Sequence, residues 1–209
     1  MIKFGKLTYP RGNIVKEIIR IKNLGFDYAE IGIEAPTYAK IMLNNKPLII
    51  KSLKRFAYPP IGHTAWWYDF GSPYEIVRNA WVNQAMIDIK AANELGINLL
   101  NFHFSYISNF LMYEDKFGKI ILENHVKSLD KLSKFAKKLR VTLMLENGEE
   151  KFEYYRYVLD RVPDIKVHFD VGHAFISGGM PTIKRFVSYF GDRIEHIHIH
   201  DTNGKKPEH

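Results

Sequence analysis

The stretches IKVHFD (Ile165–Asp170) and IEHIHIH (Ile194–His200) decide the fold of this chain. In both, apolar and ionisable residues alternate, which is the pattern of a β-strand whose two faces meet different surroundings. In the second stretch, isoleucines separate His196, His198 and His200. Helices must cover the apolar face, so we expect the ionisable face to point into the interior of a barrel.

Five further short runs of β-forming residues precede these two, at residues 2–7, 28–33, 57–63, 99–104 and 141–146. Longer segments of helical period separate them. Asn13 can cap a helix that Gly25 ends, and Ser72–Pro73 opens a long helix that Gly96 ends. Seven βα units in succession predict a TIM (β/α)8-type barrel, with the eighth βα unit missing from this chain. We therefore expect residues 1–209 to form a single, C-terminally truncated domain.

Ionisable residues close five of the predicted strands. They are His63, His103, Glu146, Asp170 and His198 or His200. The carboxyl ends of barrel strands meet on one face, where barrel active sites assemble. Burying such groups unpaired would cost several kcal/mol each, and a divalent cation compensates that cost directly. The chain has no cysteine, so histidines and carboxylates must supply every ligand, which suits zinc or manganese, with magnesium or cobalt as alternatives.

Each of these histidines alone is more often a satisfied core residue than a ligand, and only their convergence favours a metal or acid–base site. His168 and His196 lie one layer deeper along their strands, so we expect them to hydrogen-bond the ligands. His125 lies within a predicted helix, and we expect it at the surface.

Composition narrows the class of protein. The chain has 209 residues, of which 46% are hydrophobic, so it is not a disordered protein. Because it has no cysteine, it is not a disulfide-stapled miniprotein either. Its formal net charge is +7. The positive charge would attract an anionic ligand but does not specify nucleic acid, because it is scattered over predicted helix faces. No apolar run is long enough for a membrane span, and the absence of cysteine suits a cytoplasmic protein.

Several motifs resemble the xylose isomerase-like TIM barrels, a family that includes sugar-phosphate isomerases, epimerases and the endonuclease IV group. They are GFDYAEIGIE (residues 25–34), IGHTAWW (61–67), LLNFHFS (99–105), LMLENGEE (143–150), VHFDVGHAFISGG (167–179) and IEHIHIHDTNGKKPEH (194–209). The resemblance covers nearly the whole chain from Gly25 onward. The family hosts several chemistries, so it does not define the substrate.

The resemblance first implies a metal-dependent isomerase or epimerase acting on a sugar-like hydroxy-carbonyl compound. Glu146, Asp170 and His198 would bind the metal, with a further glutamate expected on an eighth strand beyond His209. Glu146 would also move a proton at the carbon beside the carbonyl, and His173 would assist.

The substrate-binding residues implied by this interpretation are Glu30, His63, Trp66, Trp67, His103, His173, His200 and Asp201. The tryptophans belong to an aromatic group with Tyr68 and Phe70 that could form an apolar wall against a sugar ring. Packing of this segment onto the barrel rim explains the aromatic group equally well.

The alternative is an endonuclease IV-like phosphodiesterase acting on abasic DNA. His63 and His103 would then share a second ion with Glu146, and His209 would help His173 to hold a third. The aspartate expected two residues before His209 is missing, and His200 stands where the endonucleases have asparagine. We therefore favour a small sugar-like substrate over nucleic acid. A non-catalytic metal- or ligand-binding relative and a homo-oligomer also remain open.

Overall fold

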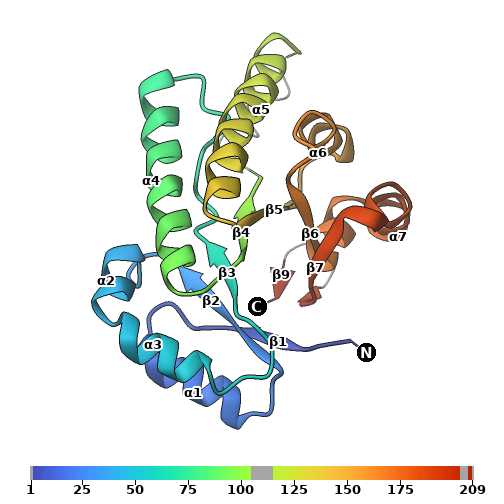
Figure 1. The fold of residues 1–209 in the computed structure, drawn as a ribbon. Helices are drawn as coiled ribbons and strands as arrows, with labels where there is room; N and C mark the ends of the chain where they lie inside the picture. The colour runs from blue at the N-terminus through green and yellow to red at the C-terminus, as the bar shows by residue number, and fades with distance from the viewer. Residues whose placement is uncertain (1, 105–114, 203–206, 209) are drawn as a thin grey trace. The chain divides into compact units, whose positions relative to one another are not determined.

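The computed structural model describes residues 2–104, 115–202 and 207–208. Seven strands form one sheet in the order of the chain, and every pair whose register is defined is parallel (Figure 1). The strands are β1 (Gly5–Leu7), β2 (Tyr28–Ile33), β3 (Ile61–Thr64), β4 (Leu99–His103), β5 (Thr142–Glu146), β6 (Lys166–Asp170) and β7 (Ile194–His198). This is the arrangement of a TIM-type barrel with seven βα units, as the sequence predicted.

Helices follow the strands as expected for repeated βα units. They are α1 (Ile14–Asn23), α2 (Ala39–Asn44), α3 (Lys46–Leu53), α4 (Glu75–Glu94), α5 (Asp115–Lys138), α6 (Phe152–Leu159) and α7 (Val171–Phe190), with a short 3-10 helix at Gly191–Arg193. A two-residue antiparallel pair, β8 (Asp201–Thr202) and β9 (Pro207–Glu208), follows β7. Within the described ranges, no helix is long and apolar enough to cross a membrane.

The chain forms two compact units. Unit 1 comprises residues 1–65, 83–101 and 134–142, and unit 2 comprises residues 66–82, 102–133 and 143–209. In unit 1, the Asn13 side chain caps α1 by accepting a hydrogen bond from the Lys16 backbone at 3.1 Å, as predicted. Gly25 then ends the helical segment with a φ of +89°, a conformation that favours glycine.

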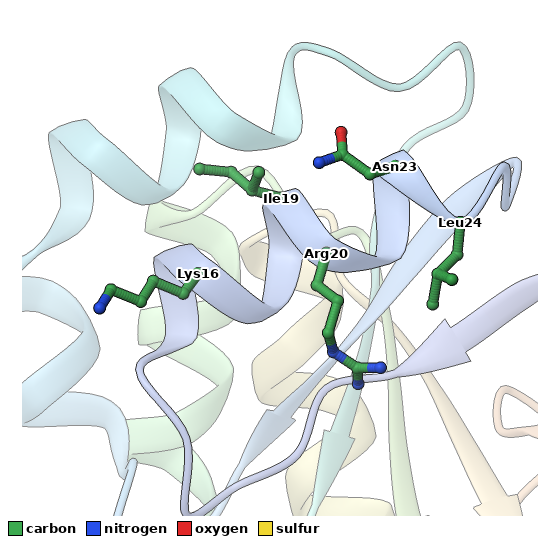
Figure 2. A pocket seen from close by; sticks show the side chains of 5 residues that line it. All are labelled: Lys16, Ile19, Arg20, Asn23 and Leu24. Atoms are coloured by element: carbon green, nitrogen blue, oxygen red, sulfur yellow. The ribbon is translucent and has the colours of Figure 1, made fainter.

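An open pocket of about 340 Å³ lies beside α1 in unit 1 (Figure 2). Lys16, Ile19, Arg20, Asn23 and Leu24 line it. All five belong to α1 or to the residue that follows it, and none is a predicted site residue. The Arg20 guanidinium is already paired with Glu17 at 2.8 Å.

Aromatic packing dominates the interior of unit 2. Phe169 of β6 stacks on Phe186 of α7, with ring centroids 5.3 Å apart. Tyr155 and Phe152 of α6 contact the same Phe186 ring, at 5.3 and 5.1 Å. Rings of this size bury much apolar area, so α6 and α7 are anchored on the apolar face of β6. The ionisable face of β6 is thereby held on the opposite side, as the alternation predicted.

Several bounds differ from those predicted, among them the start of β1 at Gly5 rather than at residue 2. β3 begins at Ile61 rather than at residue 57, because Pro59 and Pro60 lack the backbone N–H that a strand interior needs. β7 ends at His198, which leaves His200 in the connection to β8. Helices α2 and α3 lie in a segment where no helix was predicted.

Candidate metal centre

Glu146 ends β5 and is 2% exposed. Its carboxylate contacts histidines from three other strands. His103 Nε2 lies 3.1 Å from Oε2, and His198 Nδ1 lies 3.1 Å from Oε1. His168 Nδ1 lies 3.5 Å from Oε2. The strand ends β4, β5, β6 and β7 thus contribute to one cluster, as the alternation in the sequence predicted for these residues.

The surroundings of Glu146 keep it ionised. Burial by itself raises the pKa of this carboxyl, but the charges of His168 and His103 and hydrogen bonds from His103 and His198 hold the pKa well below 4.5. A carboxylate at neutral pH can bind a cation or accept a proton. Glu146 therefore offers a charged carboxylate as a ligand atom.

Asp170 ends β6 and also caps α7. Its Oδ1 accepts a hydrogen bond from the backbone N–H of His173 at 2.7 Å, and its Oδ2 lies 3.9 Å from His198 Nδ1. Asn147 fixes the Asp170 backbone from both sides, accepting its N–H and donating to its carbonyl, each at 2.9 Å. Asn147 was not among the predicted site residues, although it directly follows Glu146, where a residue at the end of β5 can reach the end of β6.

Glu146, Asp170 and His198 offer donor atoms that lie within 4.8 Å of one another. Two buried carboxylates and one imidazole are ligands that zinc and manganese accept, and the chain offers no thiolate that would favour a softer ion. The residues therefore fit the divalent ion that the sequence predicted, although they do not distinguish one such metal from another.

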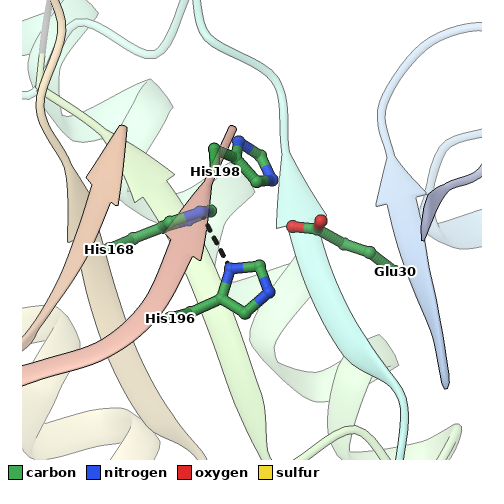
Figure 3. A group of neighbouring side chains, drawn as sticks. All are labelled: Glu30, His168, His196 and His198. Carbon is green, nitrogen blue, oxygen red and sulfur yellow. Dashed lines mark hydrogen bonds between the residues drawn. The ribbon is translucent and has the colours of Figure 1, made fainter. Parts of the chain in front are cut away.

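His168 and His196 each lie two residues before a candidate ligand, His168 before Asp170 on β6 and His196 before His198 on β7. Figure 3 shows these rings and that of His198 projecting from the neighbouring strands β6 and β7 toward one another. His196 Nδ1 and His168 Nε2 share a hydrogen bond of 2.9 Å, and the other nitrogen of His168 faces Glu146. Polar contacts thus run from His196 through His168 to Glu146. The sequence predicted that both histidines would hydrogen-bond the ligands, but His196 reaches Glu146 only through His168, so its direct contact with a ligand stays a prediction.

Two predicted site residues belong to unit 1. Glu30 in β2 is 3% exposed, and His63 in β3 is 8% exposed. In the sheet register, Gly32 pairs with His63, which pairs in turn with Asn101 of β4. Their roles in substrate or metal binding stay predictions.

The aromatic segment after β3 divides into two parts. Tyr68 and Phe70 are buried, and both rings pack against Phe102 of β4, with centroids 6.1 and 5.6 Å away. These two residues therefore pack in the core, the structural alternative considered above. Trp66 is 51% exposed and meets Trp67 edge to face at 5.7 Å, so a role for the tryptophans in substrate binding stays a prediction.

The surface position predicted for His125 is wrong. This residue of α5 is fully buried, its ring stacks on Phe104 at 4.5 Å, and its Nδ1 lies 2.9 Å from the Ile121 carbonyl oxygen. Burial lowers its pKa to about 4, which keeps the imidazole neutral. The signal was present in the sequence, because Ile121 and Leu129 lie four residues to either side of His125 on one helical stripe.

The remaining predicted residues follow β6 and β7. His173 lies in the first turn of α7, where its Nδ1 is 4.0 Å from a Glu149 carboxylate oxygen. His200 Nε2 lies 3.0 Å from Asp170 Oδ1. Asp201 begins β8 and is exposed, and its backbone carbonyl faces His200. His209 lies outside the described residues.

The chain belongs to the xylose isomerase-like TIM barrel family, whose model matches residues 18–209. It is similar to the probable endonuclease 4 of Aquifex aeolicus, with 26% identity over an alignment that covers all of this chain and 81% of that protein.

Solved structures share the fold. A D-tagatose 3-epimerase-like protein aligns with a TM-score of 0.83 and 22% identity, over 98% of this chain and 78% of that one. A 3-keto-D-glucoside 4-epimerase from E. coli aligns with a TM-score of 0.74 and 18% identity, over 96% of this chain and 80% of that one. These likenesses show a fold that the chain shares with both proteins.

Proposed function

We propose that this protein is a divalent-metal-dependent isomerase or epimerase for a sugar or a sugar-like hydroxy-carbonyl compound. The observation that carries this proposal is the buried and ionised Glu146 carboxylate, 3.1 Å from His198, which in turn faces Asp170. Three ligands are fewer than zinc or manganese requires, so substrate oxygens could complete the coordination.

Each ligand would have a separate part in the reaction. When bound, a divalent ion supplies Lewis acidity that polarises a substrate carbonyl. Glu146 would take the proton from the adjacent carbon and return it at a different position or on the other face. Asp170 is held by Asn147 and by the first turn of α7, so it would orient the ligands rather than move. A carboxylate of low pKa is a weak base, so the carbonyl must be polarised before Glu146 can act.

His173 would contact the substrate. It projects from the first turn of α7 beside Asp170, and its side chain is about one-fifth exposed. An imidazole at that position can donate to or accept from a substrate hydroxyl in either tautomer. The exposed Trp66 would offer an apolar ring face to the carbons of a sugar.

Proton exchange with solvent tests the proposal. The protein, loaded with Mn²⁺ or Zn²⁺, would be incubated with a panel of ketoses and aldoses in D₂O, and deuterium incorporation and new epimers followed by NMR. We expect exchange at a carbon next to the carbonyl, lost in Glu146→Gln. Glu195→Gln removes an exposed carboxyl from β7 and serves as the matched control. Metal binding without exchange on any substrate of the panel would overturn the proposal.

The second candidate is an endonuclease IV-like phosphodiesterase, favoured by the identity to the Aquifex aeolicus protein along the whole chain. His103 lies against Glu146 at 3.1 Å, as a further ligand would require. Cleavage of a duplex oligonucleotide containing one abasic site distinguishes the two functions. Cleavage by the metal-loaded protein that disappears in His103→Asn would support this candidate. Failure of both assays with metal bound would favour a non-catalytic metal-binding protein.

A further inference from the structure

The two oxygens of Asp170 face different partners. Oδ2 lies toward His198, at 3.9 Å, within the metal centre already described. Oδ1 lies 3.0 Å from His200 Nε2 and accepts the backbone N–H of His173. Donor atoms of Asp170, His173 and His200 all lie within 4.8 Å of one another. One buried carboxylate therefore separates two sets of potential ligands.

We propose that His200, His173 and Asp170 form a second divalent-cation site, joined to the first through the Asp170 carboxylate. Oδ1 would bind the second ion and Oδ2 the first. The inference rests on the metal centre of the proposed function. It makes His200 and His173 ligands of the second ion, in place of the substrate-binding role that the sequence suggested for both and that the proposed function kept for His173.

The hydrogen bonding of His200 identifies its ligand atom. Nδ1 lies 2.9 Å from the carbonyl oxygen of Asp201, which can only accept a hydrogen bond, so Nδ1 carries a proton. Nε2 is then the nitrogen that faces Oδ1 of Asp170. A proton on Nε2 or a metal ion between the two atoms would account for this short distance. A histidine that donates its second nitrogen to a backbone carbonyl is the arrangement by which proteins orient metal-binding imidazoles.

The backbone leaves space for this ring. Gly172 follows Asp170 by two residues, and a Cβ added there would lie 2.2 Å from Cε1 of His200, far inside van der Waals contact. The imidazole therefore rests directly on the first turn of α7. A methyl group at position 172 would therefore displace the His200 ring from this place beside Oδ1.

The charge of the site selects a cation. The amino-terminal end of a helix often binds phosphate, but here the carboxylate of Asp170 already caps α7. Asp170 is only 2% exposed, so its negative charge is poorly screened by solvent and would repel an anion. The 3.0 Å between Nε2 and Oδ1 is close to the roughly 3.3 Å that separates neighbouring ligands around a tetrahedral zinc ion.

Mn²⁺ titration with electron paramagnetic resonance tests the second site. Two Mn²⁺ ions bridged by a carboxylate give an exchange-coupled spectrum, whereas a single ion gives its isolated hyperfine pattern. We expect the coupled spectrum in the wild-type protein. We expect His200→Asn to bind one ion fewer per chain, with second-site affinity reduced by about 100-fold or more, and to show only the isolated pattern. Gly172→Ala keeps every ligand but displaces the His200 ring, so it should also bind one ion fewer and show only the isolated pattern.

Circular dichroism and thermal melting would establish that the variants fold. Glu195→Gln is again the control, and His198→Asn should lose the first ion but retain the one at His200. A His200→Asn protein with unchanged stoichiometry and spectrum would overturn the second site. Sugar turnover is scored separately, because two coupled ions without turnover would refute the proposed function and leave this inference standing.

Discussion

Glu150 carries a buried carboxyl and was not among the predicted site residues. Its Oε2 accepts the backbone N–H of Gly148 at 2.9 Å, and its Oε1 makes no hydrogen bond within the described part of the chain. Burial raises the pKa of Glu150 to about 8, the Gly148 hydrogen bond offsets part of that rise, and the charges of Glu146 and Glu149 add to it. Glu150 is therefore protonated in the folded protein at neutral pH.

This protonation makes stability depend on pH. The pKa of Glu150 is about 8 in the folded chain and 4.5 in the unfolded chain, so its contribution is fully present below pH 4.5 and is lost as pH rises toward 8. Each pH unit across that interval corresponds to about 1.4 kcal/mol, which makes the full loss up to about 5 kcal/mol. Glu150→Gln cannot ionise and keeps an acceptor for Gly148, so we expect it to avoid this loss.

Urea unfolding near pH 4.5, about 6.5 and about 8.5 measures the effect. A chelator must be present, because a bound cation would lower the pKa of Glu150 through its charge. The free energy of unfolding of Glu150→Gln minus that of the wild-type protein should increase steadily with pH. Glu195→Gln removes an exposed carboxyl and serves as the control. A difference that stays constant across the three pH values would refute the reasoning.

Four further predictions concern the same unit. Asn147→Ala leaves the buried N–H and carbonyl of Asp170 without their partner and should lower the free energy of unfolding by about 2–4 kcal/mol, measured with urea. Gly71→Ala would place a Cβ 2.2 Å from the His125 ring and should cost about 1–3 kcal/mol, visible as a lower Tm; an unchanged Tm would contradict the packing described. Because burial lowers the pKa of His125 to about 4, wild-type stability falls as pH drops from 6.5 through 4, and His125→Phe should show a shallower fall in the same urea titration. Zn²⁺ at 100 times its Kd should stabilise the wild-type protein by about 2.7 kcal/mol, whereas His198→Asn should gain far less at that concentration; equal gains in thermal melts would exclude His198 as a ligand.

Most strands of the sheet could be predicted from the sequence. A strand with apolar side chains on one face and ionisable side chains on the other shows a sequence pattern that repeats every two residues. β2 has the predicted bounds, and β6 and β7 begin within one residue of theirs. Glu146 and Asp170 were predicted as strand-end residues, and both lie there, buried. The helix starting after Asn13 was predictable for a similar local reason, since its cap involves neighbours in sequence.

Features that depend on distant residues were not predictable in this way. The double hydrogen bond of Asn147 to Asp170 joins residues 23 positions apart, so no local sequence pattern indicates it. For His125, the helical stripe with Ile121 and Leu129 could have indicated burial, but only the structure shows that its ring stacks on Phe104 and lies against Gly71.

The sequence by itself determined which side chains of the strands face the interior, because alternation along a strand follows from backbone geometry alone. It therefore determined the class of fold, the absence of thiolate ligands, and the carboxylates and histidines available to a metal. Only the tertiary structure decided which donor atoms meet. Whether Asp170 turns one oxygen to His198 and the other to His200 depends on side-chain rotamers and on the space above Gly172, which packing between elements sets.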